Sequence, residues 1–139
     1  MRFLDSSVFI HAFLKPKRKL SNKEKLIKNK AKKIISRVDN GEEVATTVIH
    51  LSEILNIIES RLGLVKSIQF LLRVLSLSNI KILDVAKEDY EAALLIAQRY
   101  SISPNDALAY IKMKQHGIKE IYTFDKHFKN IPDIAIIQN

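Results

Sequence analysis

The chain contains no cysteine, only three glycines and three prolines, and no long uninterrupted apolar run. The absence of cysteine excludes disulfide bonds and thiolate zinc sites, and it fits a cytoplasmic protein. The chain is 47% hydrophobic and has little glycine and proline, which excludes a disordered or fibrous protein. No apolar stretch approaches a membrane span, and the N-terminus lacks the layout of a signal peptide. The 139 residues therefore predict one globular domain, residues 1–139.

The positive charge is concentrated in one segment. The net charge is +8, and residues 15–33 hold ten Lys or Arg residues and one acid, Glu24. The rest of the chain has thirteen basic and fourteen acidic residues. Such a patch can neutralise phosphates, which favours nucleic acid as a partner; a solvated helix face is the alternative. Because no aromatic residue interrupts the segment, we expect contact with a nucleic-acid backbone rather than base stacking, through Lys15, Lys17, Arg18, Lys19 and Lys23.

Strand-like and helix-like patterns alternate along the chain. Short apolar runs predict strands at residues 2–5, 44–47, 80–85, 119–123 and 134–137. Apolar residues three or four apart predict helices at residues 23–38, 50–61, 65–77, 87–99 and 104–116. Strands that alternate with helices imply a parallel sheet covered on both faces. The expected fold class is therefore α/β, a three-layer α/β/α sandwich around a mostly parallel sheet of about five short strands.

Four carboxylates lie where predicted strands end or predicted helices begin. Asp5 closes the first apolar run, and Asp125 follows the fourth predicted strand. Glu53 and Asp106 lie in the first turns of predicted helices. Taken singly, Glu53 reads as an exposed helix acid, Asp106 as part of a capping motif with Ser103, and Asp125 as a turn residue. Asp5 alone is equally weak evidence for a site.

The four positions are more informative together, because in a parallel α/β fold they face the same edge of the sheet. Carboxylates that converge in a bare cleft repel one another by on the order of several kcal/mol. A divalent cation removes this repulsion, and oxygen ligands without cysteine favour Mg²⁺ or Mn²⁺. The chemistry that such a site predicts is phosphodiester hydrolysis, in which one or two ions activate the attacking water.

Four segments carry a resemblance to a known family: residues 3–10 (FLDSSVFI), 47–54 (TVIHLSEI), 103–109 (SPNDALA) and 121–128 (IYTFDKHF). With these segments in this order and spacing, the chain resembles a PIN domain, specifically the small VapC-type toxins of toxin–antitoxin pairs. The resemblance covers nearly the whole chain. It implies an endoribonuclease that depends on Mg²⁺ or Mn²⁺, acts on an RNA substrate, forms a homodimer and is silenced by a cognate antitoxin.

The resemblance also implies roles for individual residues. Asp5, Glu53, Asp106 and Asp125 would form the acidic quartet that is both catalytic and metal-binding, and Ser7 and Thr123 would be supporting residues. The chain departs from the commonest pattern in two places, neither of which removes a ligand. One is the Lys-rich stretch before the second strand, and the other is Ser6-Ser7, where Thr-Asn is frequent.

Two other functions remain open on the residues alone. A haloacid-dehalogenase-type phosphatase also begins with an Asp after its first strand, but it usually carries a second Asp two residues later, where this chain has Ser7. The other is a non-catalytic RNA- or protein-binding domain whose acids are caps and turn residues. No histidine is needed as a base, and each of the four is expected to be structural or exposed: His11, His50, His116 and His127.

The apolar faces of residues 51–62 and 65–77 exceed what one side of a small sheet needs. They predict either an interface with a second copy or the antitoxin, or a deeper intramolecular core.

Overall fold

A five-stranded sheet organises the computed structural model, which describes all residues, 1–139. The strands are β1 (Arg2–Leu4), β2 (Val44–Thr47), β3 (Ile80–Leu83), β4 (Glu120–Tyr122) and β5 (Ala135–Ile137). The helices are α1 (Ser6–Phe13), α2 (Asn22–Asp39), α3 (Val48–Leu62), α4 (Leu64–Ser76), α5 (Lys87–Tyr100) and α6 (Pro104–Gln115), and a short 3₁₀ helix covers Lys126–Asn130. None of the helices combines the length and the apolar character needed to cross a membrane.

The strand order is β3-β2-β1-β4-β5, and every neighbouring pair is parallel. The chain therefore builds outward from β1 through β2 to β3 and then returns to the other side of β1 with β4 and β5. This reversal lies between β1 and β4, whose register pairs Leu4 with Tyr122. In open parallel sheets, the crevice beyond the carboxyl ends of the strands at such a reversal is where ligands bind.

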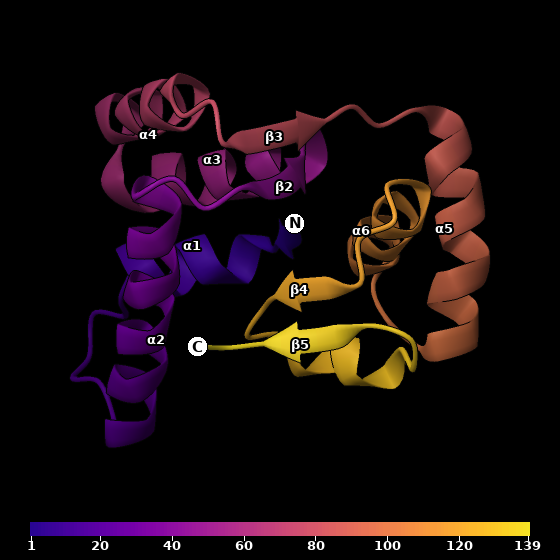
Figure 1. Ribbon diagram of the computed structural model, residues 1–139. Helices are drawn as coiled ribbons and strands as arrows, with labels where there is room; N and C mark the ends of the chain where they lie inside the picture. The colour runs from indigo at the N-terminus through magenta and orange to yellow at the C-terminus, as the bar shows by residue number, and fades with distance from the viewer.

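Helices cover both faces of the sheet, which confirms the predicted three-layer architecture. Figure 1 shows α1 to α4 on one side of the sheet and α5 and α6 on the other. The neighbouring β1 residues Phe3 and Leu4 are both fully buried, each in the apolar core of a different face. A strand buried on both faces reads as a continuous apolar run, so the first strand was recognisable from its sequence.

The first helix, α1, is absent from the sequence-based prediction, which assigns no element to residues 6–13. The structure corrects this. Asp5 is the N-cap of α1, and its carboxylate accepts the backbone N–H of Ser7. At the other end, the Lys28 ammonium of α2 donates to the carbonyls of His11, Ala12 and Leu14 at 3.1, 3.2 and 3.1 Å. These contacts satisfy backbone groups that an eight-residue helix leaves free.

The helix that carries Glu53 begins earlier than predicted, at Val48 rather than residue 50. The cause is Thr47, whose hydroxyl accepts the backbone N–H groups of Ile49 and His50, both at 3.1 Å. Threonine is a favoured N-cap because it satisfies amide groups of the first turn. The cap places the start of α3, and with it Glu53, directly after the carboxyl end of β2.

Candidate functional site

The carboxyl ends of β1 and β4 lie side by side. The backbone N–H of Asp5 donates to the carbonyl of Tyr122 at 3.0 Å, which continues the ladder between the two strands. Beyond them lies an open cavity of about 410 Å³. The structure brings all four predicted acids to the wall of this cavity: Asp5, Glu53, Asp106 and Asp125. Ser7 and His127 also line it.

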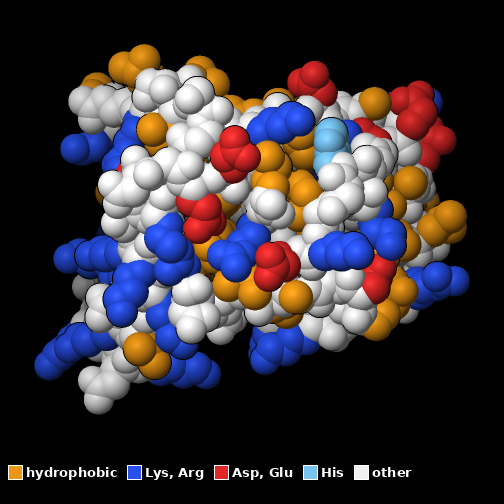
Figure 2. Space-filling view, viewed as in Figure 1, with side chains coloured by type: hydrophobic (Ala, Val, Ile, Leu, Met, Phe, Trp, Pro, Cys, Tyr) orange, Lys and Arg blue, Asp and Glu red, His pale blue; other side chains and the backbone are white.

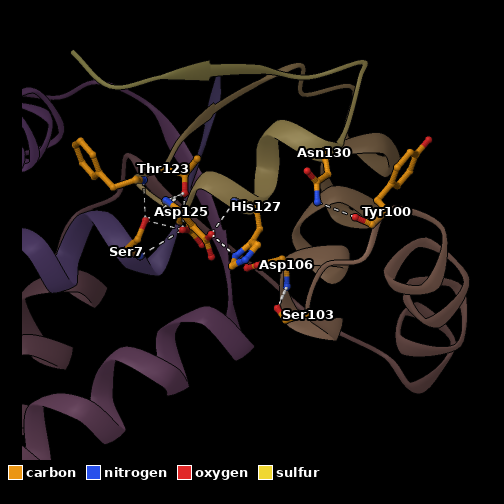
Figure 3. A network of polar contacts seen from close by, with 10 residues as sticks. Ser7, Tyr100, Ser103, Asp106, Thr123, Asp125, His127 and Asn130 are labelled. Atoms are coloured by element: carbon orange, nitrogen blue, oxygen red, sulfur yellow. Dashed lines mark hydrogen bonds and ion pairs between the residues drawn. The ribbon is translucent and has the colours of Figure 1, made fainter.

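Asp5 is buried at the base of the cavity and is held by two hydroxyl groups. Its Oδ2 atom accepts from the hydroxyl of Ser7 at 2.6 Å and from that of Thr123 at 2.8 Å. The same hydroxyls accept backbone N–H groups from the β4 side, Ser7 from Phe124 and Thr123 from Asp125, both at 3.0 Å. Figure 3 shows this network joining the start of α1 to the segment after β4. Ser7 and Thr123 therefore orient Asp5, and their supporting role in catalysis stays a prediction.

A second group of possible ligands lines the same cavity as Asp5. One atom each from Asp106, Asp125 and His127 lies within 4.8 Å of the other two. Asp125 Oδ1 accepts from the backbone N–H of His127 at 2.9 Å and lies 2.8 Å from the His127 ring Nδ1 (Figure 3). His127 is exposed, as expected, but its place in the cavity wall was not predicted. Its position two residues after Asp125, in a tight turn, is the signal that could have indicated it.

Asp106 shows what these charges do to one another. Ser103 caps α6 by accepting the backbone N–H of Asp106 at 3.1 Å, so the predicted N-cap is present without the reciprocal bond of a full capping box. The Asp106 carboxyl group, however, faces the cavity. Partial burial and the negative charges of Asp5 and Asp125 raise its pKa from 3.8 to about 7. A bound divalent cation would offset this repulsion, and the oxygen-rich donor set fits such an ion.

Glu53 reaches the cavity from α3 and contacts α6. Its Oε2 atom accepts from the Asn105 side-chain amide at 3.3 Å, and Asn105 Oδ1 in turn accepts from the Tyr90 hydroxyl at 2.8 Å. Neither Asn105 nor Tyr90 was predicted. Nothing in the local pattern of the sequence indicates them, because Glu53 and Asn105 are 52 residues apart.

His50 lies buried one helical turn before Glu53. The Thr47 hydroxyl already accepts two amide groups, so it gives its own proton to His50 Nδ1 at 2.7 Å. The imidazole is then neutral and carries its proton on Nε2, which is buried without a partner. Burial lowers the pKa of His50, against the opposing pull of Asp5 and Glu53. This histidine packs against Phe3 and fits the structural role expected of it.

Comparison with known proteins assigns the family. The sequence pattern of the PIN domain matches residues 2–134, which is nearly the whole chain. The chain belongs to the PIN domain family. Among curated proteins, none is similar enough to count as a match.

Solved structures share the fold of this PIN domain. The Mycobacterium tuberculosis toxin VapC20, described as cleaving the sarcin–ricin loop, has a TM-score of 0.76 and 20% identity, with 100% of each chain covered. A toxin–antitoxin complex from Klebsiella pneumoniae has a TM-score of 0.68 and 16% identity, with 97% of this chain and 96% of that chain covered. DNA-bound VapBC from Salmonella typhimurium has a TM-score of 0.65 and 20% identity, with 99% of this chain and 97% of that chain covered.

The Lys-rich segment of this PIN domain is not uniformly free to bind a ligand. Arg18 makes two hydrogen bonds of 2.8 Å to Glu24, and this contact lowers the pKa of Glu24 to about 2. Lys28 is engaged with the end of α1. The other candidate contacts are exposed and form no ion pair: Lys15, Lys17, Lys19 and Lys23. Figure 2 shows Lys and Arg side chains gathered around the N-terminal part of α2.

The surplus of apolar surface lies on α4. In α3, the apolar residues Leu51, Ile54 and Ile58 are buried in the core, so this face is intramolecular. In α4, a row of large apolar side chains is more than half exposed: Leu64, Val65, Ile68, Leu72 and Leu75. An exposed apolar row of this kind is typical of an interaction surface.

Proposed function

We propose that this PIN domain, residues 1–139, is a metal-dependent endoribonuclease that hydrolyses phosphodiester bonds of RNA. The observation that carries the proposal is the convergence of Asp5, Glu53, Asp106 and Asp125 on one open cavity at the reversal point of the sheet. The raised pKa of Asp106, about 7, accords with this crowding of negative charge. An arrangement that disfavours its own ionisation is explained if a cation completes it.

The residues that would hold the cation are Asp5, Glu53, Asp106 and Asp125. Their carboxylate oxygens suit Mg²⁺ or Mn²⁺. When bound, the ion would supply charge neutralisation at the phosphate and activation of the attacking water. The protein's own contribution is orientation: Ser7 and Thr123 fix Asp5, and the turn at His127 fixes Asp125.

The substrate would approach over the Lys-rich segment. Lys15, Lys17, Lys19 and Lys23 present unpaired charges that can contact phosphates without reading bases. Arg18 contributes less to this surface than its sequence position suggests, because Glu24 already neutralises it. We propose that the protein acts in the cytoplasm, which an RNA substrate and the absence of cysteine both fit.

We further propose that the protein is the toxin of a toxin–antitoxin pair, silenced by a cognate antitoxin, and that it forms a homodimer through the exposed row on α4. The support is the shared fold with VapC20 and with two toxin–antitoxin assemblies. A short neighbouring gene for a DNA-binding protein would support the toxin assignment. An isolated gene expressed without growth arrest would oppose it.

The two alternatives make different predictions about the same residues. A phosphatase of the haloacid-dehalogenase type needs an acid–base carboxylate where Ser7 stands, and the Ser7 hydroxyl is already committed to Asp5 and to Phe124 N–H. A non-catalytic binding domain would bind RNA with an affinity that is indifferent to EDTA. It also leaves the crowding of acids around Asp106 without an explanation.

Cleavage of a labelled single-stranded RNA tests the proposal. We expect cleavage with Mg²⁺ or Mn²⁺, none with EDTA, and none with Asp5→Asn or Asp106→Asn. The matched control is Asp84→Asn, because Asp84 directly follows β3 but is exposed and lies outside the cavity. Cleavage at the wild-type rate by Asp5→Asn, or unchanged cleavage with EDTA, would refute the metal-dependent nuclease.

A further inference from the structure

Two hydrogen bonds link three helices at one side of the cavity. The Tyr90 hydroxyl on α5 donates to Asn105 Oδ1 on α6 at 2.8 Å, and Asn105 Nδ2 donates to Glu53 Oε2 on α3 at 3.3 Å. This series of hydrogen bonds has one direction, because each donor along it meets an acceptor. Its last member is one of the four acids, and its first two members do not line the cavity.

We propose that Asn105 is a positioning residue for Glu53, and that Tyr90 acts through Asn105 by fixing the orientation of its amide. This inference rests on the proposed metal-dependent function, for which it assigns a supporting layer around the acidic site. Groups that hold metal ligands from behind determine ligand orientation, and their loss typically weakens metal binding by about 10- to 100-fold.

The amide of Asn105 needs such an orienting partner. An asparagine side chain presents a donor at one end and an acceptor at the other, and the two ends have nearly the same shape. Turned over, Asn105 would present its oxygen to the Glu53 carboxylate and repel it. The Glu53 carboxylate can only accept, so it selects the orientation in which Nδ2 faces it, and the Tyr90 hydroxyl then donates to the Oδ1 end and holds the amide in that orientation. Burial and the negative charge of Glu53 raise the pKa of Tyr90, which keeps this donor protonated.

Glu53 depends on this single contact, whereas Asp5 and Asp125 each have more than one hydrogen-bond partner. Asp5 accepts from two hydroxyl groups, and Asp125 is held by the turn at His127. Glu53 has no hydrogen bond or ion pair other than the one from Asn105. Its side chain also has one more rotatable bond than that of aspartate, so more conformational freedom must be lost before it can act as a ligand.

The neighbouring residue Asp89 sets the position of Tyr90 relative to α6. Its buried carboxylate accepts from Lys112 at 3.3 Å and from Gln115 at 2.8 Å, both on α6. It also accepts the backbone N–H of Ala86 at 2.9 Å, which closes the first turn of α5. The register between α5 and α6 is thus fixed one residue away from Tyr90.

Mn²⁺ binding to the metal-free protein tests the inference, measured by electron paramagnetic resonance at pH 8. We expect Asn105→Ala to weaken binding by about 10- to 100-fold. Tyr90→Phe should weaken it less, and it should have no further effect in the Asn105→Ala background, since Tyr90 acts only through Asn105. This loss of effect in the double variant is a readout that a merely structural role would not produce.

The controls separate this inference from the proposed function. Asn56→Ala, at an exposed position on the helix of Glu53, and Tyr100→Phe, whose hydroxyl has no partner, should bind Mn²⁺ as the wild type does. If Glu53→Gln weakens binding and Asn105→Ala does not, the positioning role is wrong and the metal site stands. If Glu53→Gln itself has no effect, Glu53 is no ligand, and both its assigned role and the inference fail.

A measurement on the metal-free protein gives a second readout. The side-chain amide signals of Asn105 in a nitrogen–proton correlation spectrum should shift on Tyr90→Phe and on Glu53→Gln, because each removes one end of the bond chain. Tyr90→Phe deletes a single oxygen atom from a partly exposed side chain, so the fold is retained. Amide signals that stay in place in both variants would overturn the inference.

Discussion

The hydroxyl of Thr123 donates a 2.8 Å hydrogen bond to the carboxylate of Asp5, and this bond ties the segment after β4 to the end of β1. Thr123 is fully buried, and its oxygen also accepts the backbone N–H of Asp125 at 3.0 Å. One side chain therefore orients Asp5 directly and Asp125 through its backbone. It joins two acids that are 120 positions apart in sequence but follow adjacent strands.

Thr123→Val keeps the shape of this side chain and removes its hydroxyl. We expect a loss of about 1–3 kcal/mol in the free energy of unfolding, because acceptors and donors around a buried site lose their partner. We also expect Mn²⁺ affinity to fall by about 10-fold or more, because Asp5 is no longer held. Urea unfolding measures the first effect, and Mn²⁺ titration measures the second.

The matched control for this substitution is Thr46→Val in β2. Thr46 is equally buried, but its hydroxyl has no hydrogen-bond partner. Replacing it with valine should be neutral or stabilising and should leave Mn²⁺ affinity unchanged. Equal losses in the two variants would mean that the Thr123 contact has no special part in the site.

Asp106→Asn should stabilise the metal-free protein in a pH-dependent way. The pKa of Asp106 is raised from 3.8 to about 7 by burial and by Asp5 and Asp125. Between these two values the folded protein holds a proton that the unfolded chain has released, so stability falls as pH rises through this window. The variant removes this loss. Its gain in Tm over the wild type should be largest above pH 7 and should shrink toward pH 4.

Adding Mg²⁺ should reverse the order of the two proteins in this comparison. A cation that binds only the folded state raises the Tm of the wild type, while Asp106→Asn gains little because one ligand has lost its charge. Differential scanning fluorimetry with and without Mg²⁺ measures both effects. A Tm difference that is the same at pH 4 and pH 8 would contradict the raised pKa.

The sequence predicted those features that local patterns encode. The strand that carries Asp5 is a continuous apolar run because both of its faces are buried, and the helix that carries Asp106 begins at a recognisable Ser103-Pro104 cap. In a parallel sheet, carboxyl ends of strands share one edge, so the convergence of the four acids followed from element order alone.

Features that depend on contacts between distant residues were not predictable in this way. Helix α1 has only eight residues, too few for a clear period, and its end is held by Lys28 of the next helix. The net charge of the Lys-rich segment includes Arg18 and Lys28 as if both were free. In the structure, Arg18 pairs with Glu24, and Lys28 donates to backbone carbonyls. The contact of Asn105 with Glu53 likewise requires the packing of α6 against α3.

Replacing Lys17, Lys19 and Lys23 together with alanine should weaken RNA binding without affecting the fold. These side chains are exposed and unpaired. With EDTA present to prevent cleavage, a plot of log K against log salt should flatten by about 0.7 for each lost contact with single-stranded RNA. The matched control replaces exposed lysines elsewhere, Lys66 and Lys81, and should leave the slope unchanged.

Lys28→Met should give the opposite pattern from the lysine triple variant. Its ammonium group donates to three carbonyls at the end of α1, so its loss should lower the free energy of unfolding by about 1–3 kcal/mol. The salt dependence of RNA binding should stay close to that of the wild type. A large change of slope with unchanged stability would place Lys28 in the RNA surface instead.

Ile68→Lys on α4 should convert a homodimer into a monomer. The side chains of Ile68 and Leu72 are 58% and 68% exposed, and their helix contains no acidic residue that could form an ion pair with a lysine. A charge placed in the centre of an apolar interface must be buried unpaired, whereas the same charge on a free surface costs little. Sedimentation velocity should show a dimer for the wild type and a monomer for the variant. The substitution should leave the Tm of the monomer unchanged. Leu95→Lys, 68% exposed on α5, tests whether the opposite side of the molecule associates instead, because a monomer from this variant alone would move the interface away from α4.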